Sequence, residues 1–233
     1  MLKFERILCP LDFSEFSFRA YDYAQSLARH YEAKLFVGHV LSPLFAAYPS
    51  YVSPENALEL HRGLRTHAEQ QLQDFVKART HNGFPTETVV CEGQVTDSIL
   101  AFAASRQVDL IVIGTHGRHG FDHFLLGSVT EKVLRKARCP VLAVHKPTRD
   151  FVTPESGVEP VRLAKIVFAT DFSRHADHAL GYALSLAQEY EAELTLLHVL
   201  EDIPPSWDLS TVSADVVERL EKPIPAEARE SCT

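Results

Sequence analysis

Five apolar runs alternate with stretches of helical periodicity over residues 1–147, and this alternation restricts the fold more than any other feature of the chain. The runs cover residues 6–10, 34–41, 87–91, 109–114 and 140–145. Most of them are continuously apolar, as in parallel strands that are covered on both faces. The sequence therefore predicts an α/β fold with an open, five-stranded parallel sheet, Rossmann-like, with strand order 3-2-1-4-5 and helices on both faces.

The helices between these strands carry their own start signals. Ser14 is expected to cap the first helix, and Thr96 or Asp97 the third. The fourth helix is expected to open at Ser128, where Glu131 stands at the right spacing for a capping box. A second helix is predicted from apolar residues that recur every three or four positions from Leu60 to Phe75.

The start of the chain is repeated near its end. Residues 7–41 match residues 166–200 without a gap at an offset of 159, and Asp-Phe-Ser and His-Val-Leu recur in register, which indicates duplication. We predict a complete domain over residues 1–147, a proline-containing linker over 148–161, and an incomplete second repeat over 162–233. The second repeat lacks counterparts of strands three to five. So small a unit is unstable alone, so it should dock on the first, pair with another chain or remain partly disordered.

Composition excludes several classes of protein. The formal net charge of −8 argues against a nucleic-acid partner, because the phosphate backbone needs a basic face. No apolar run is long enough for a membrane span, and the first residues lack the pattern of a signal peptide. The four cysteines form no CxxC pair and are interpreted as reduced thiols. We therefore expect a cytoplasmic protein without a membrane partner.

A glycine-containing segment, GTHGRHGFDHFLLGSVTEK, links the fourth strand to the fourth helix. Its glycines Gly114, Gly117 and Gly127, with Ser128, suggest a cradle for nucleotide phosphates at a helix N-terminus. The segment is neither a Walker A loop nor a dinucleotide fingerprint, because it lacks Gly-Lys-Ser/Thr and follows the fourth strand. The alternative is a strand–helix turn whose glycines serve tight packing.

Two further residues end strands beside this segment. Asp12 follows strand one, next to the end of strand four, and could accept hydrogen bonds from ribose hydroxyls or help to start the first helix. Val40, near the end of strand two, could meet an adenine edge through its main chain or belong simply to the core.

Together these residues resemble the universal stress proteins of the ATP-binding type. The family pattern G-x2-G-x9-G-[ST] fits Gly114, Gly117, Gly127 and Ser128, and the resemblance covers residues 3–146 and, in part, 163–201. It implies the adenine nucleotide alpha hydrolase-like version of the fold. It also implies a nucleotide site made of Pro10, Leu11, Asp12, Val40, Ile113, Gly114, His116, Gly117, Gly127, Ser128, Val129 and Thr130. In that site the first three residues would flank adenine and ribose, Val40 would contact adenine, and the residues from Gly127 to Thr130 would bind phosphates, with Mg²⁺ or Mn²⁺ bridging.

The resemblance leads to a function and to a partner. We expect an ATP-binding protein of the cellular stress response that hydrolyses ATP slowly at most, because no catalytic residue can be assigned. A homodimer is expected through the last strand, from Val141 to His145. The alternatives are an interaction module of the same fold that binds no nucleotide, and a nucleotide-hydrolysing or adenylating enzyme. The histidines at 116, 119 and 123 are interpreted as solvated rather than metal-binding, and Asp171 of the second repeat as a helix start.

Overall fold

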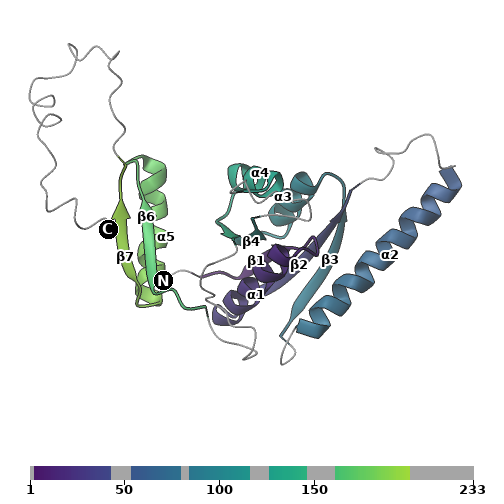
Figure 1. Cartoon of the computed structure of the whole chain (residues 1–233), viewed down its shortest axis with the longest axis horizontal. Coiled ribbons are helices and arrows are strands. Elements are labelled where there is room, and N and C mark those ends of the chain that lie inside the picture. The colour runs from purple at the N-terminus through teal and green to yellow at the C-terminus, as the bar shows by residue number, and fades with distance from the viewer. Residues whose placement is uncertain (1–2, 43–53, 80–83, 116–125, 146–160, 200–233) are drawn as a thin grey trace, which may run out of the picture.

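The computed structural model describes residues 3–42, 54–79, 84–115, 126–145 and 161–199 (Figure 1). The first repeat contains the strands β1 (Arg6–Pro10), β2 (Lys34–Leu41), β3 (Thr86–Glu92), β4 (Leu110–Gly114) and β5 (Val141–Val144). Its helices are α1 (Glu15–His30), α2 (Pro54–Arg79), α3 (Val95–Ser105) and α4 (Ser128–Lys136). The second repeat contains β6 (Lys165–Ala169), α5 (Arg174–Glu189) and β7 (Glu193–Leu197).

The sheet of the first repeat has the predicted order, β3-β2-β1-β4-β5, and all of its strand pairs are parallel. The central strand β1 pairs with β2 on one side and, through Ile7 and Leu8, with β4 on the other. The prediction that strands one and four are neighbours is therefore confirmed. Their carboxyl ends meet at the position where strand order reverses, which is where open α/β sheets bind ligands.

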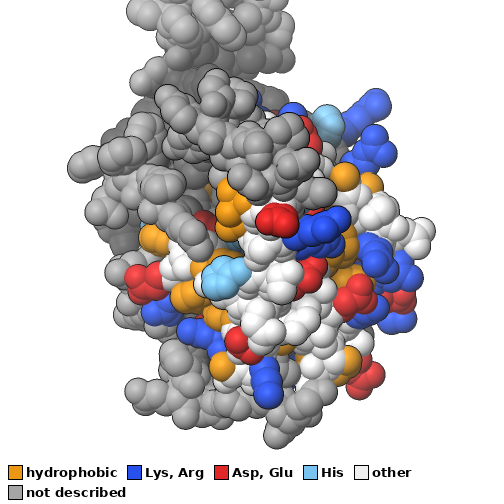
Figure 2. All heavy atoms as spheres, turned by 90° about the vertical axis from the view of Figure 1, so that its right-hand side faces the viewer, with side chains coloured by type: hydrophobic (Ala, Val, Ile, Leu, Met, Phe, Trp, Pro, Cys, Tyr) orange, Lys and Arg blue, Asp and Glu red, His pale blue; other side chains and the backbone are white. Residues whose placement is uncertain are grey.

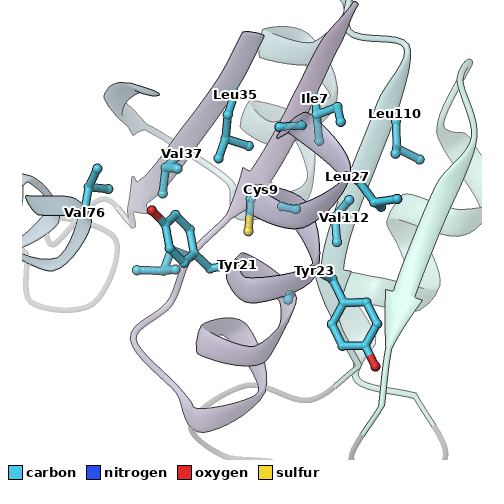
Figure 3. Packing of buried hydrophobic residues seen from close by; sticks show 14 of the residues in the cluster. Ile7, Cys9, Tyr21, Tyr23, Leu27, Leu35, Val37, Val76, Leu110 and Val112 are labelled. Atoms are coloured by element: carbon cyan, nitrogen blue, oxygen red, sulfur yellow. The ribbon is translucent and has the colours of Figure 1, made fainter. Parts of the chain in front are cut away.

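Two apolar layers cover the sheet. On one face, Ile7 and Val37 are fully buried with Tyr21 of α1 and Leu72 of α2, and Figure 3 shows Tyr21 pointing toward Val37 and Cys9 beside the strands. On the other face, Ile111 packs with residues of α3 and α4. Because both faces are covered, the strands are apolar at successive positions, and this is the property from which the sequence predicted them.

The helix starts are only partly as predicted. Ser14 caps α1, accepting a hydrogen bond from the Ser17 amide through its side chain. The prediction for α3 is wrong, because the helix begins at Val95 and its cap is Gln94, which makes no side-chain capping bond. The capping box at α4 is also wrong: Gly127 is the cap residue, which places Ser128 one position inside the helix.

The second repeat reproduces the first β-α-β unit. Its strands pair in the same register, with Ile166 opposite Leu194 as Ile7 is opposite Leu35. Side chains that are buried in the first copy are exposed here: Val167 is 63% exposed where its counterpart Leu8 is 2% exposed. Among the described residues no further strand flanks this two-stranded sheet, which accounts for the exposure.

The described part of the second repeat docks on α1. Glu189, at the end of α5, accepts a hydrogen bond from the Tyr31 hydroxyl at 3.0 Å and lies 2.6 Å from Nε2 of His30. The His30 ring also stacks on Tyr190. At the offset of 159, Glu189 and Tyr190 are the counterparts of His30 and Tyr31, so equivalent helix ends meet, as in a twofold-related interface. The described residues of the second repeat therefore contact the first repeat, which is one of the three outcomes expected for it.

Charges are mixed on the face that Figure 2 presents, where acidic and basic side chains alternate between apolar ones. Within the described ranges, no helix combines the length and the apolar character needed to cross a membrane.

Candidate functional site

The loop after β1 is held by its own backbone and side chains. Leu11 is buried, and its amide donates to the Gly38 carbonyl of β2 at 2.7 Å. The next residue, Asp12, accepts two hydrogen bonds at Oδ1, one from the Ser14 amide at 3.0 Å and one from the Ser14 hydroxyl at 2.6 Å. Asp12 therefore helps to start α1, which was one of its two expected roles, and this fixes its carboxylate at the carboxyl end of the central strand.

The two described ends of the glycine segment are fastened to each other. The Gly127 amide donates to the Thr115 carbonyl at 2.6 Å, and the Thr130 hydroxyl donates to the Gly114 carbonyl at 2.7 Å. Thr115 is itself joined to β5 through its amide, which donates to the Val144 carbonyl at 3.0 Å. These bonds hold the first turn of α4 beside the end of β4.

Gly114 is required by packing. A Cβ atom added at this position would lie 2.8 Å from the carbonyl carbon of Phe16 and 2.9 Å from its oxygen, both in the first turn of α1. Side-chain atoms essentially never approach backbone atoms so closely, so only glycine fits here. The packing alternative for the glycines is thus supported at Gly114, independently of any ligand.

The first turn of α4 supplies the anion-binding features. Ser128, Val129 and Thr130 follow the cap, and the amides at the start of a helix have no partner within it. The helix dipole favours an anion at the same place. Ser128 is exposed, Val129 is half-buried and Thr130 is buried. One acidic side chain also stands in this turn, Glu131, and it pairs with Arg135 at 2.8 Å.

A narrow pocket lies between the carboxyl ends of the strands and α3. It is lined by Leu8, Pro10, Gly38, His39, Val40, Val89, Cys91, Ser98, Ile99 and Phe102. Two predicted site residues, Pro10 and Val40, are among these. The space inside is only about 10 Å³, so a flat ring would lie against the mouth of the pocket. Partial burial of Cys91 raises the pKa of its thiol, so the thiol stays protonated at neutral pH.

A larger hollow, of about 680 Å³, lies elsewhere. It is formed near the start of β2 and β3 and is lined by Arg29, Glu32, Ala33, Lys34, Phe84, Pro85, Thr86 and Glu87. It contains none of the predicted site residues, and it lies at the amino ends of the strands. Ligands of parallel α/β sheets bind at the carboxyl ends, so we take the narrow pocket and its rim as the candidate site.

The structure brings most of the predicted site residues to this edge. The described ones are Pro10, Leu11, Asp12, Val40, Ile113, Gly114, Gly127, Ser128, Val129 and Thr130. His116 and Gly117 lie outside the described residues, as do His119, Asp122 and His123. Leu11 and Ile113 are buried, so only their main chains can meet a ligand without rearrangement. Sequence reasoning missed the walls from β3 and α3, such as Cys91 and Phe102, because no motif marks them.

Three comparisons with known proteins agree. A family model, the universal stress protein family, matches residues 3–145 and 163–230. The universal stress protein MJ0531 of Methanocaldococcus jannaschii is 34% identical over 149 residues, which are 63% of this chain and 85% of that protein.

Among the solved structures that are similar to this chain, two illustrate the likeness. Hypothetical protein MJ0577 of the same organism superposes with a TM-score of 0.56 at 27% identity, over 64% of this chain and 100% of that one. A universal stress protein from Archaeoglobus fulgidus superposes with a TM-score of 0.62 at 24% identity, over 94% of this chain and 74% of that one. The second likeness concerns the fold alone.

Proposed function

Because the chain belongs to the universal stress protein family, we propose that it binds ATP at the carboxyl ends of β1, β2 and β4 and acts in the cellular stress response. The observation that carries the proposal is the fastening of the first turn of α4 to the end of β4. Asp12, at the end of the adjacent strand, is fixed independently. A helix N-terminus for phosphates and a carboxylate for ribose thus stand at the end of one central strand pair.

In this proposal each part of the nucleotide meets a different element. The adenine lies at the mouth of the narrow pocket, against Pro10 and the main chain of Val40. The ribose hydroxyls donate to Asp12, and the phosphates accept hydrogen bonds from the amides of Ser128 to Thr130, with Gly127 allowing close approach. His116 and Gly117 complete the ribose and phosphate side.

The metal ion, Mg²⁺ or Mn²⁺, would arrive with the triphosphate. Within the described ranges no group of three or more His, Cys, Asp or Glu side chains is placed to hold a metal ion. The chain's own contribution is therefore to bind the phosphate oxygens through amides and hydroxyls. The ion would supply positive charge that neutralises the phosphates.

Hydrolysis is expected to be slow at most. Efficient attack on the γ-phosphate needs a residue that orients or deprotonates water. None of the site residues within the described ranges is assigned this role here, since Asp12 is assigned to the ribose and Glu131 is paired with Arg135. Turnover well above a trace would favour the enzyme alternative.

A second candidate is an interaction module that binds no nucleotide. It is favoured by one observation, the packing role of Gly114, since that glycine needs no ligand to explain it. Equilibrium dialysis with labelled ATP and Mg²⁺ separates the two candidates.

We also propose a cytoplasmic location and the domain boundaries given above. We further propose a homodimer through β5, an edge strand on which Leu142 is 36% exposed.

Substitution of Gly127 by phenylalanine tests the site. The backbone of Gly127 has φ −70° and ψ 152°, which any residue adopts, so the fold should remain. The bulky side chain would stand at the entrance to the first-turn amides, and ATP affinity should fall at least about tenfold, or 1.4 kcal/mol. Gly63→Phe is the matched control, because nothing lies within 4 Å of a Cβ added there. Unchanged ATP affinity in Gly127→Phe would contradict the proposed site.

A further inference from the structure

His39 is tied to the loop that carries Asp12. Its Nδ1 lies 2.7 Å from the Leu11 carbonyl oxygen, and because a carbonyl only accepts, Nδ1 carries the hydrogen and donates. The Phe13 ring lies against the His39 ring, with centroids 4.9 Å apart. We name His39, Leu11 and Phe13 the strand-end clamp. Its bond joins β2 to the residue directly before Asp12.

The clamped loop has a conformation that needs support. Phe13 has φ +62°, in the left-handed region that residues other than glycine rarely adopt. Such a backbone persists only where its surroundings determine it. The strained residue directly follows Asp12, so any relaxation of the loop would move the carboxylate. The clamp is thus placed to fix the side chain that we assign to the ribose.

The second repeat contains the same clamp. Nδ1 of His198 lies 2.7 Å from the Thr170 carbonyl, and the rings of Phe172 and His198 are 4.6 Å apart. Phe172 has φ +59°, and Asp171 accepts from the Ser173 amide at 2.9 Å, as Asp12 does from Ser14. The conformation of this loop therefore recurs as a unit within one chain.

The two copies differ in their surroundings. Phe13 packs against the main core, whereas Phe172 is 72% exposed. The similar geometry therefore accompanies the shared local residues, Asp-Phe-Ser with a His at or after the end of the next strand, and it does not depend on the core packing around Phe13. The first copy stands beside the glycine segment and the narrow pocket, which His39 itself lines.

We propose that His39 is a positioning residue for nucleotide binding, which acts by donating from Nδ1 to the Leu11 carbonyl and so holding Asp12 in place for the ribose hydroxyls. The inference rests on the proposed function. His39 contributes by fixing the loop before the ligand arrives, so that the ligand does not have to order it. Preorganisation of this kind lowers the cost of binding.

Three variants of the 233-residue chain test the proposal. His39→Phe keeps an aromatic ring for Phe13 but removes the donor, and ATP affinity should fall about tenfold, the upper range for one neutral hydrogen bond. His39→Asn retains a side-chain N–H donor and should bind within about threefold of the wild type. His198→Phe removes the same hydrogen bond from the second repeat and should bind ATP as the wild type does. Circular dichroism controls for folding.

A second readout separates positioning from general destabilisation. Wild-type protein should bind ATP more tightly than 2′,3′-dideoxy-ATP, which lacks both ribose hydroxyls, whereas His39→Phe should bind the two about equally. A merely structural defect would weaken both ligands by the same factor.

The outcomes are distinguishable. A wild type that binds no ATP overturns the proposed function and this inference with it. A wild type that binds ATP while folded His39→Phe binds equally well overturns only the inference. An equal weakening for both ligands in His39→Phe, or a loss of ATP affinity in His198→Phe, also overturns it.

Discussion

Substitution of Gly114 by alanine is expected to destabilise the first repeat through contact with the backbone of α1. The new Cβ would lie 2.8 Å from the Phe16 carbonyl carbon, and ordinary contact begins at 3.4 Å. The atoms in the way are mainly backbone, so either β4 or the start of α1 must move by about 0.6 Å. Overpacking of this kind costs about 1–3 kcal/mol, which the reduced freedom of the unfolded chain offsets by about 0.4–1 kcal/mol.

The net destabilisation is then about 1–2 kcal/mol, or a fall in melting temperature of about 2–8 °C for a protein of this size. Urea unfolding followed by circular dichroism measures it. Gly63→Ala is the matched control in α2, where the added methyl group meets nothing within 4 Å. It should leave stability unchanged or raise it by up to about 1 kcal/mol. If Gly114→Ala proved as stable as Gly63→Ala, the packing argument would be refuted.

Two further predictions concern the docking of the second repeat. Glu189→Ala removes the acceptor of the half-buried Tyr31 hydroxyl and the partner of the exposed His30 ring. The loss should cost about 0.5–1.5 kcal/mol, as for an ordinary hydrogen bond, so hydrogen exchange in α5 should accelerate. Glu193→Ala, which removes only an exposed pair with Lys165, should change little, and equal exchange in the two variants would speak against the contact. The pKa of Tyr31 is raised, mainly by burial and further by the neighbouring Tyr190 and Glu189. The docked state therefore keeps this proton to a higher pH than the undocked state, so docking should be intact below pH ~10 and weaken above it. Protection factors correct for the rise of intrinsic amide exchange with pH, and values in α5 that stayed constant from pH ~9 to ~11 would contradict this.

The parallel sheet was predictable because the same pattern, an apolar run followed by helical periodicity, occurs several times along the chain, so the prediction does not depend on any single residue. Five apolar runs separated by helical periodicity leave few alternatives. Strands one and four are expected as neighbours because a doubly wound sheet reverses direction there. The family match also covers residues 163–230, further along the second repeat than the resemblance traced by sequence pattern, 163–201. The hydrophobic pattern over many residues was therefore sufficient to predict the fold class.

Single-residue features were less predictable. Whether Gly127 or Ser128 caps α4 depends on backbone angles that the capping-box pattern does not specify, and the pattern chose the wrong one. The role of Gly114 depends on how closely α1 approaches β4, which is a long-range contact between distant parts of the sequence. The pocket walls that α3 supplies also depend on long-range contacts between distant parts of the sequence.

Interfaces between repeats were not predictable either. The duplication identified His30 and Glu189 as equivalent positions but gave no reason for them to meet. Their contact requires that the ends of α1 and α5 meet, which is a long-range arrangement. Sequence similarity between the repeats is compatible with many such arrangements.

Crystallisation of the chain with ATP and Mg²⁺ would test the central claim most directly. We predict electron density for the triphosphate against the first-turn amides of α4, with the ribose hydroxyls within hydrogen-bond distance of Asp12. A vacant edge at β1 and β4, or ATP bound instead in the hollow lined by Arg29 and Phe84, would contradict the account.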